Sequence, residues 1–171
     1  MRYAEFHNPQ AAEAPSLQAW HAALLGADHL EELASIEAQC FSSGWSFKQY
    51  QSAYAEKWFE AYGIFISGQM AGYITMSIIA DELEVLNIAV LKPFRSRGYA
   101  FQLMKFALND SCTRRHWKTA FLEVSDNNIH ALALYGKLGF KRSGIRHSYY
   151  SDGTNAVCMV LSADIFQVTQ I

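Results

Sequence analysis

The stretch FRSRGYAFQLMKFAL, residues 94–108, places a short basic loop directly before an amphipathic helix. From Ala100 onward its apolar residues fall at positions 100, 103, 104, 107 and 108, the spacing of a helix with one buried face. The apolar run before it is stopped by Pro93 and predicts a strand, so residues 92–98 form a strand-to-helix loop. Backbone N–H groups at such a helix start have no partner within the helix and favour anions.

The composition of this loop is compatible with phosphate. Gly98 can adopt a positive φ, and without a Cβ it lets an anion approach the backbone. Arg95 and Arg97 add charge and forked donors suited to phosphate oxygens. The loop lacks the Gly-Lys-Ser/Thr of a Walker motif and the three glycines of a dinucleotide fingerprint. By itself it leaves a phosphate cradle and a plain basic turn equally open.

Around this loop, periodicity and turn residues predict an α/β domain with a mostly antiparallel sheet. A tight hairpin is expected at Ser67-Gly68-Gln69, and the strands at 82–91 and 119–125, separated by a helix, are expected to be parallel neighbours. The remaining strands are expected at 19–25, 62–67, 70–80, 140–150 and 155–163, and the other helices within 27–41 (capped by Asp28), 44–62 (capped by Ser46) and 126–140 (ended by Gly139).

The chain of 171 residues, 51% of them apolar and 14% aromatic, is long enough for one packed domain. We expect an N-terminal extension over residues 1–18, the domain over 19–165 and a tail over 166–171. A net charge of −2 argues against a general nucleic-acid or membrane-surface binder, and the N-terminus has no apolar run typical of secretion. The three cysteines, Cys40, Cys112 and Cys158, fit neither a disulfide framework nor a zinc site, so we expect free thiols in the cytoplasm and no metal.

Three polar residues stand out within apolar segments. Glu123 lies inside the strand AFLEVS, where a carboxylate is costly to bury unless it is paired or functional; the alternative is an edge position facing solvent. Tyr135 lies seven residues after Asn128, on the same helical face, although a tyrosine there also suits the core. Asn87 interrupts the strand VLNIAV.

Together these segments resemble a known family. Arg95-x-x-Gly98-x-Ala100, following LNIAV, resembles the Arg/Gln-x-x-Gly-x-Gly/Ala signature of the GNAT acetyltransferases, which bind acetyl-CoA. The segments LEV, ALYGKLGF and IRHSYY are similar to those of RimI-like members, which acetylate the N-terminal alanine of a small-subunit ribosomal protein. The resemblance covers about residues 27–162, and Ala100 stands where many members have Gly.

The resemblance implies a GNAT-like α/β (α+β) fold: a mixed, mostly antiparallel sheet of about seven strands, flanked by about four helices and splayed between the two central parallel strands. Backbone groups of the strand 82–91 would meet the pantetheine arm and polarise the thioester carbonyl, and the basic loop would hold the pyrophosphate. The residues implied to contact acetyl-CoA are Ile88, Ala89, Val90, Arg95, Ser96, Arg97, Gly98, Tyr99, Ala100 and Asn128.

The resemblance also implies catalytic roles. Glu123 would accept the proton of the attacking amine through water, and Tyr135 would protonate the departing CoA thiolate. Acceptor specificity would come from residues 40–50 and 145–155, with contacts from Trp45, Tyr149 and Tyr150; a packed strand end is the other interpretation of the two tyrosines.

The predicted function is transfer of an acetyl group to the N-terminal α-amine of a protein, with a ribosomal protein as the partner. Asp81, Glu82 and Glu84 would attract such a basic protein or simply form a solvated hairpin end. Transfer to a small amine such as a polyamine, amino sugar or antibiotic, and a non-catalytic acyl-CoA-binding module, are the alternatives. We expect a monomer or homodimer that binds neither nucleic acid nor membrane.

Overall fold

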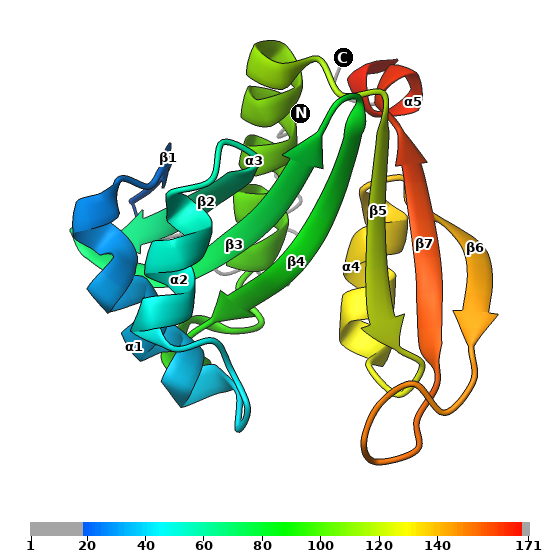
Figure 1. Cartoon of the computed structure of the whole chain (residues 1–171), viewed down its shortest axis with the longest axis horizontal. Coiled ribbons are helices and arrows are strands. Elements are labelled where there is room, and N and C mark those ends of the chain that lie inside the picture. The colour runs from blue at the N-terminus through cyan, green and yellow to red at the C-terminus, as the bar shows by residue number, and fades with distance from the viewer. Residues whose placement is uncertain (1–18, 169–171) are drawn as a thin grey trace, which may run out of the picture.

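The computed structural model describes residues 19–168, so the expected extension and the last three residues of the expected tail lie outside it. Seven strands form one sheet in the order β1-β2-β3-β4-β5-β7-β6 (Figure 1). The strands are β1 Trp20–Leu24, β2 Phe59–Ile66, β3 Gln69–Ile79, β4 Glu82–Val90, β5 Thr119–Ser125, β6 Lys141–Arg146 and β7 Ala156–Ser162. The helices are α1 Leu30–Cys40, α2 Phe47–Tyr54, α3 Tyr99–Arg115, α4 Ile129–Lys137 and α5 Ala163–Val168, with short 3₁₀ turns η1 Ala27–His29 and η2 Lys92–Phe94.

Every neighbouring pair of strands is antiparallel except β4 and β5, which are parallel. This confirms the predicted fold class and the predicted parallel pair. The structure adds α5, which crosses the expected boundary between domain and tail. Phe166 on this helix is fully buried, and its ring lies 6.4 Å from that of Trp117, so the core extends to this residue.

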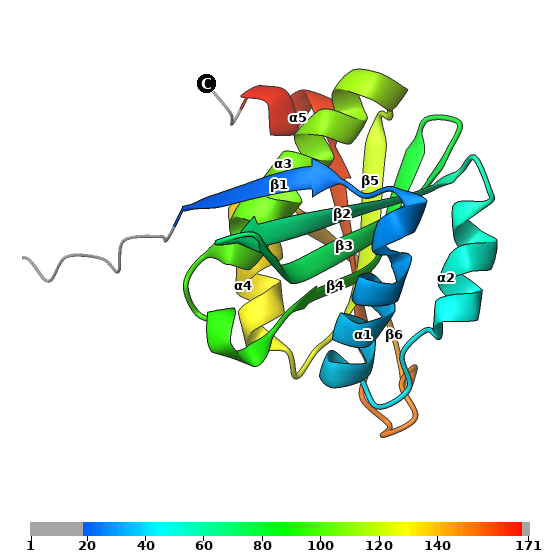
Figure 2. The ribbon, with the colours of Figure 1, turned by 90° about the vertical axis from the view of Figure 1, so that its left-hand side faces the viewer.

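The helices cover the two faces of the sheet differently (Figure 2). The helices α3 and α4 pack on one face, where Leu103, Met104 and Leu108 join the larger core. The helices α1 and α2 pack on the other face over β2, β3 and β4, around a second core. The buried face of α3 begins at Tyr99, which is 1% exposed, one residue before the predicted start at Ala100.

The sheet is splayed between β4 and β5 (Figure 1). The two strands pair only where Glu82–Glu84 meet Thr119–Phe121. In β4, Asn87 lies opposite Thr75 and Val85 lies opposite Met76, so Leu86 is an extra, bulged residue. A bulge bends its strand and increases its twist. The second half of β4 therefore diverges from β5 and presents an edge that β5 does not pair.

Local sequence signals are mostly confirmed. The Ser46 side chain accepts a hydrogen bond from the Gln49 N–H, and Gln49 completes a capping box at α2. The hairpin between β2 and β3 turns at Ser67 (φ 52°) and Gly68 (φ 83°), a pair of positive values that suits the twist of a tight hairpin.

Three boundaries differ from the prediction. Asp28 does not cap α1, because the chain already turns through η1 and His29 occupies the cap position without a side-chain hydrogen bond. The helix predicted within 44–62 ends at Tyr54, because Phe59–Ile66 pair with β3 instead. The strand predicted over 140–150 ends at Arg146, and residues 147–150 belong to a loop.

Candidate functional site

The unpaired half of β4 carries free backbone positions toward the opening in the sheet. The N–H of Leu91 donates to the carbonyl of Ala71, on the β3 side. Because backbone groups alternate along a strand, those of Ile88 and Val90 point to the opposite edge, toward the opening. The backbone of Ala89 faces β3, so of the three predicted residues two present main-chain groups to a ligand in the opening.

The loop after β4 forms a concave backbone turn at the start of α3. Ser96 (φ 60°) and Gly98 (φ 83°) both have left-handed conformations. The α3 hydrogen bond from the Gln102 N–H ends on the carbonyl of Gly98, so N–H groups at the helix start have no acceptor within the helix. A Cβ built on Gly98 meets no atom within 4 Å, which leaves open space above the turn. The turn therefore has room for an anion, and the diphosphate contacts of Ser96, Arg97 and Gly98 stay predictions.

The Arg95 side chain contacts β4 and α1. Its Nε donates to the Val90 carbonyl at 2.7 Å, and its Nη2 lies 3.5 Å from the Cys40 Sγ. The guanidinium thus joins the end of β4 to the end of α1. Arg97, by contrast, is exposed beside the turn.

Asn128 begins α4 on the far side of the opening. Its side-chain oxygen accepts a hydrogen bond from the Ala131 N–H at 3.1 Å and thereby caps the helix. The oxygen is therefore engaged, and the side-chain NH₂ group is the part of Asn128 suited to a ligand oxygen.

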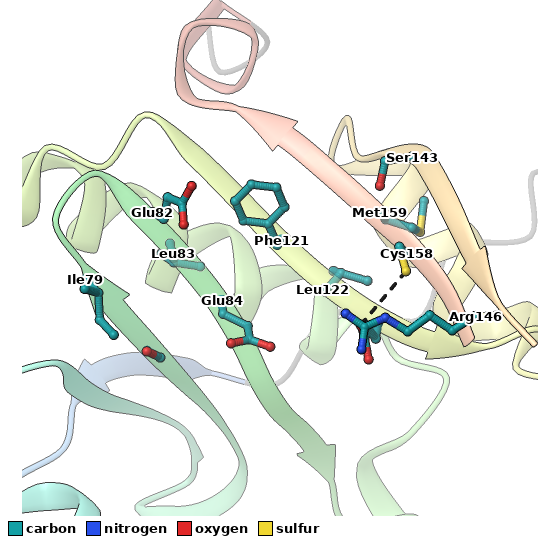
Figure 3. Close-up of a pocket in the computed structure, with 12 residues that line it drawn as sticks. Ile79, Glu82, Leu83, Glu84, Phe121, Leu122, Ser143, Arg146, Cys158 and Met159 are labelled. Atoms are coloured by element: carbon teal, nitrogen blue, oxygen red, sulfur yellow. Dashed lines mark hydrogen bonds and ion pairs between the residues drawn. The ribbon is translucent and has the colours of Figure 1, made fainter. Parts of the chain in front are cut away.

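Glu123 lines a pocket of about 310 Å³ on the sheet face opposite α3 and α4. Its neighbours Leu122 and Val124 point into the core, while Glu123 is 23% exposed in the pocket. Its Oε1 lies 2.9 Å from the Nε of Arg146, a residue that the sequence did not single out. Glu84 on β4 faces the same pocket, and Figure 3 shows it across from Arg146.

Tyr135 lies on α4, on the other face of the sheet, and is 6% exposed. Burial, followed by the nearby Tyr150, raises the pKa of Tyr135 to about 12. Burial and then the charge of Glu123 raise the pKa of Tyr150. Tyr150 is thus coupled to both predicted catalytic residues.

Tyr149 lies beside Tyr150, with ring centroids 5.2 Å apart. A hydrogen bond to Glu123 is the main cause that raises the pKa of Tyr149, and the Arg146 guanidinium lies 5.5 Å from its ring. Both tyrosines lie in the loop after β6.

Trp45 belongs to the loop between α1 and α2, residues 41–46, which we call the acceptor loop. Its ring packs against Tyr50, 5.3 Å away, and Phe59, 6.3 Å away, so much of the indole is structural. Figures 1 and 2 both show the acceptor loop and the β6–β7 loop at the same end of the molecule, where β4 and β5 diverge.

Within residues 19–168, no group of three or more His, Cys, Asp or Glu side chains is arranged to hold a metal ion. The three cysteines, all within that range, are free thiols. No helix of the described part is both long and apolar enough to cross a membrane.

Comparison with known proteins identifies relatives of the whole domain. A family model described as Acetyltransferase (GNAT) family matches residues 30–140. The chain is 32% identical over 129 residues to the ribosomal protein bS18-alanine N-acetyltransferase of Escherichia coli, covering 74% of this chain and 86% of that protein. The crystal structure of the Escherichia coli ribosomal-protein-S18-alanine N-acetyltransferase superposes with a TM-score of 0.77 at 28% identity, covering 84% of this chain and 94% of that one.

A spermidine/spermine N-acetyltransferase from Vibrio cholerae superposes equally well, with a TM-score of 0.77 over 89% of this chain and 98% of that one. Its sequence identity is only 17%, so this match is evidence for the fold alone.

Proposed function

Because the chain belongs to the acetyltransferase (GNAT) family, we propose that it transfers the acetyl group of acetyl-CoA to the N-terminal α-amine of a protein. Family membership makes it an acetyl-CoA-dependent acetyltransferase; the choice of acceptor is the proposal. The observation that carries it is the unpaired edge of β4, which leads from the open turn at Gly98 to the pocket of Glu123.

Bound acetyl-CoA would supply an activated acetyl thioester in the opening between β4 and β5. The N–H groups at the start of α3, around Gly98, would hold its diphosphate, and the NH₂ group of Asn128 would contact it from α4. The main-chain groups of Ile88 would hold the arm like an added strand, and the Val90 N–H would donate to the thioester carbonyl, whereas the Val90 carbonyl already accepts from the Arg95 Nε.

Glu123 would take a proton from the acceptor amine through water, from the pocket face of the sheet. An α-amine has a pKa near ~8, against ~10.4 for a lysine side chain, so less assistance is needed at neutral pH. Tyr135, which burial keeps protonated, would donate its hydroxyl proton to the leaving thiolate from the α4 face. A general acid and base of this kind contribute about 10²–10⁴-fold.

The charge of the pocket favours a basic acceptor. Its lining residues include three carboxylates, those of Glu82, Glu84 and Glu123, and one cation, the Arg146 guanidinium. A ribosomal protein N-terminus, the acceptor in the name of the Escherichia coli relative, fits this charge. The cytoplasm, where ribosomal proteins and free thiols are found, is the proposed location.

The test is a panel of acceptors at a fixed acetyl-CoA concentration. We expect transfer to a peptide that begins with alanine. We expect no transfer to a second peptide whose N-terminus is blocked and whose free amine is the side chain of an internal lysine. Glu123→Gln and Tyr135→Phe should each lower kcat by about 10²-fold or more while the Kd for CoA stays within about twofold. Equal rates for the wild type and both variants would refute the assigned roles.

A small polyamine is the second candidate, because the same three carboxylates suit a polycation. Transfer to spermidine but not to the alanine peptide would favour it. Binding of CoA without transfer to any amine would favour a regulatory acyl-CoA-binding module. Mass spectrometry of protein N-termini in cells with and without this chain would identify the natural acceptor.

A further inference from the structure

A group of buried polar side chains lies beneath the acceptor loop, away from Glu123 and Tyr135. Glu37 on α1 is 1% exposed, and Tyr50 on α2 and Tyr73 and Thr75 on β3 are fully buried. Within the described residues, the hydroxyls of Tyr73 and Thr75 have no hydrogen-bond partner, whereas the Tyr50 hydroxyl and the Glu37 carboxylate lie close enough to interact. Buried polar atoms without partners are rare in folded proteins and point to a function beyond packing.

Glu37 contacts the acceptor loop directly. Its Oε1 accepts a hydrogen bond from the Trp45 N–H at 2.9 Å. The same oxygen lies 3.5 Å from the Nδ2 of Asn87, which follows the bulge of β4. One carboxylate oxygen therefore joins the loop to the strand whose next residues, beginning at Ile88, border the opening.

The loop also closes tightly over Glu37. A Cβ added to Gly44 would lie 2.4 Å from the Glu37 Cγ and 2.7 Å from its Oε1. A residue larger than glycine would displace Glu37, because the Gly44 backbone lies against the Glu37 side chain and leaves no room for a Cβ. After burial, the charge of Glu37 is the next cause that raises the pKa of Tyr50, so the carboxylate also faces α2.

We propose that Glu37 is a positioning residue for the acceptor: its carboxylate fixes the acceptor loop against β4 and thereby shapes the site that receives the amine. This proposal rests on the proposed function, because it requires that the acceptor meet this loop. Burying a carboxylate lowers the stability of the fold through desolvation of its charge, and an apolar side chain of similar size would pack without this cost. The carboxylate provides what an apolar residue lacks, a directional acceptor for the Trp45 N–H.

Glu37→Leu removes this acceptor at similar volume, and Glu37→Gln keeps an oxygen for the Trp45 N–H. When a loop adopts the conformation that binds the acceptor for only a fraction of the time, the apparent affinity for the acceptor is the intrinsic affinity multiplied by that fraction. Loss of a hydrogen bond to a charged group should therefore raise the KM for an alanine peptide by about tenfold in Glu37→Leu. We expect kcat and the KM for acetyl-CoA within about twofold of wild type, and Glu37→Gln to restore the peptide KM.

Glu60→Leu is the matched control. Glu60 is also a buried acid, 7% exposed, but it pairs with Arg114 on the α3 face. Both leucine variants should lower the melting temperature, and only Glu37→Leu should raise the peptide KM. An equal KM change in both variants, or none in Glu37→Leu, would overturn the proposal, since the carboxylate would then serve stability alone.

A second variant and a second measurement cover the case in which Glu37→Leu does not fold. Gly44→Ala keeps the carboxylate but pushes the loop away, and it should raise the peptide KM with kcat preserved. Hydrogen exchange at the Trp45 amide needs no acceptor: it should accelerate in Glu37→Leu and stay slow in Glu37→Gln. Fast exchange with an unchanged peptide KM would overturn the positioning role, whereas failure of wild type to acetylate any peptide would count against the proposed function instead.

Discussion

Gly98→Ala tests whether the turn before α3 binds the diphosphate of CoA. Gly98 has a φ of 83°, and a Cβ there meets no protein atom within 4 Å. The added methyl group therefore costs the fold only the strain of a left-handed residue, about 1 kcal/mol. For a domain of this size, that corresponds to a melting temperature lower by about 2–4 °C.

The cost to a bound diphosphate should be larger. The methyl group would fill the open space above the turn, where the anion has to approach the N–H groups. Loss of one hydrogen bond to a charged group is worth about 1.5–3 kcal/mol, so the Kd for CoA should rise by about tenfold or more. Isothermal titration calorimetry measures this Kd directly.

Gly68→Ala is the control, because Gly68 has the same φ of 83° and equally open surroundings, but lies in the β2–β3 turn. The melting temperature should fall by the same amount in both variants, and the affinity for CoA should fall only in Gly98→Ala. Acetyl-pantetheine, which lacks the diphosphate, should react at the same rate with Gly98→Ala and wild type. Wild-type CoA affinity in Gly98→Ala would refute a diphosphate site at this turn.

Three further predictions concern single side chains. Because burial raises the pKa of Tyr135 to about 12, from an ordinary value of 10.0, its proton should remain available as the pH rises. The ratio of the wild-type kcat to the Tyr135→Phe kcat should thus stay constant from about pH 7 to about pH 10. A ratio that approaches one as the pH rises from about 7 to about 9 would exclude Tyr135 as the acid. Arg146→Gln removes the 2.9 Å contact with Glu123 and should lower kcat by about threefold to tenfold. Its unfolding free energy should change by less than ~1 kcal/mol, because Arg146 is 60% exposed; a larger loss in urea unfolding would make the pair structural. Arg114→Leu leaves buried Glu60 without its main cation and should lower the unfolding free energy by about 2 kcal/mol, less than for a fully buried pair because the guanidinium is 36% exposed; unchanged urea unfolding would contradict this.

The sequence predicted elements with strong periodicity or explicit turn chemistry. The strand over Thr119–Ser125 and the helix ended by Gly139 follow such signals, and the structure confirms both. The cap at Asp28 failed because a 3₁₀ turn, which leaves little periodicity, precedes α1. The helix predicted through residue 62 failed because pairing with β3 overrode local helix propensity.

The sequence was informative about the site where a motif fixes the backbone. Gly98 has the positive φ that a glycine allows, and Ser96 also has a left-handed conformation; binding of a phosphate at this turn stays a prediction. Side chains whose partners come from distant segments were less predictable. Arg95 contacts Cys40, 55 residues earlier in the chain, and no local pattern indicates that contact.

Arg146 and Glu37 were missed for the same reason. Arg146 reaches Glu123 because β6 and β5 both flank β7, an arrangement visible only once the sheet order is known. Glu37 looks like an ordinary helical acid in the sequence, and its burial follows from the way residues 41–46 fold over it.

The short β4–β5 ladder also affects how the domain holds together. In the described part of the chain, the ladder between β4 and β5 has three residue pairs, at Glu82, Leu83 and Glu84. The Asp81 carbonyl adds hydrogen bonds from two N–H groups at the start of β5, so the two halves of the sheet are joined by few backbone bonds. A cosubstrate bound along β4 would contact both halves and stabilise the folded state. At a free concentration of 100 times its Kd, it would add about 2.7 kcal/mol to the unfolding free energy. In cells where acetyl-CoA is scarce, this protein should therefore be not only idle but also more easily digested by proteases.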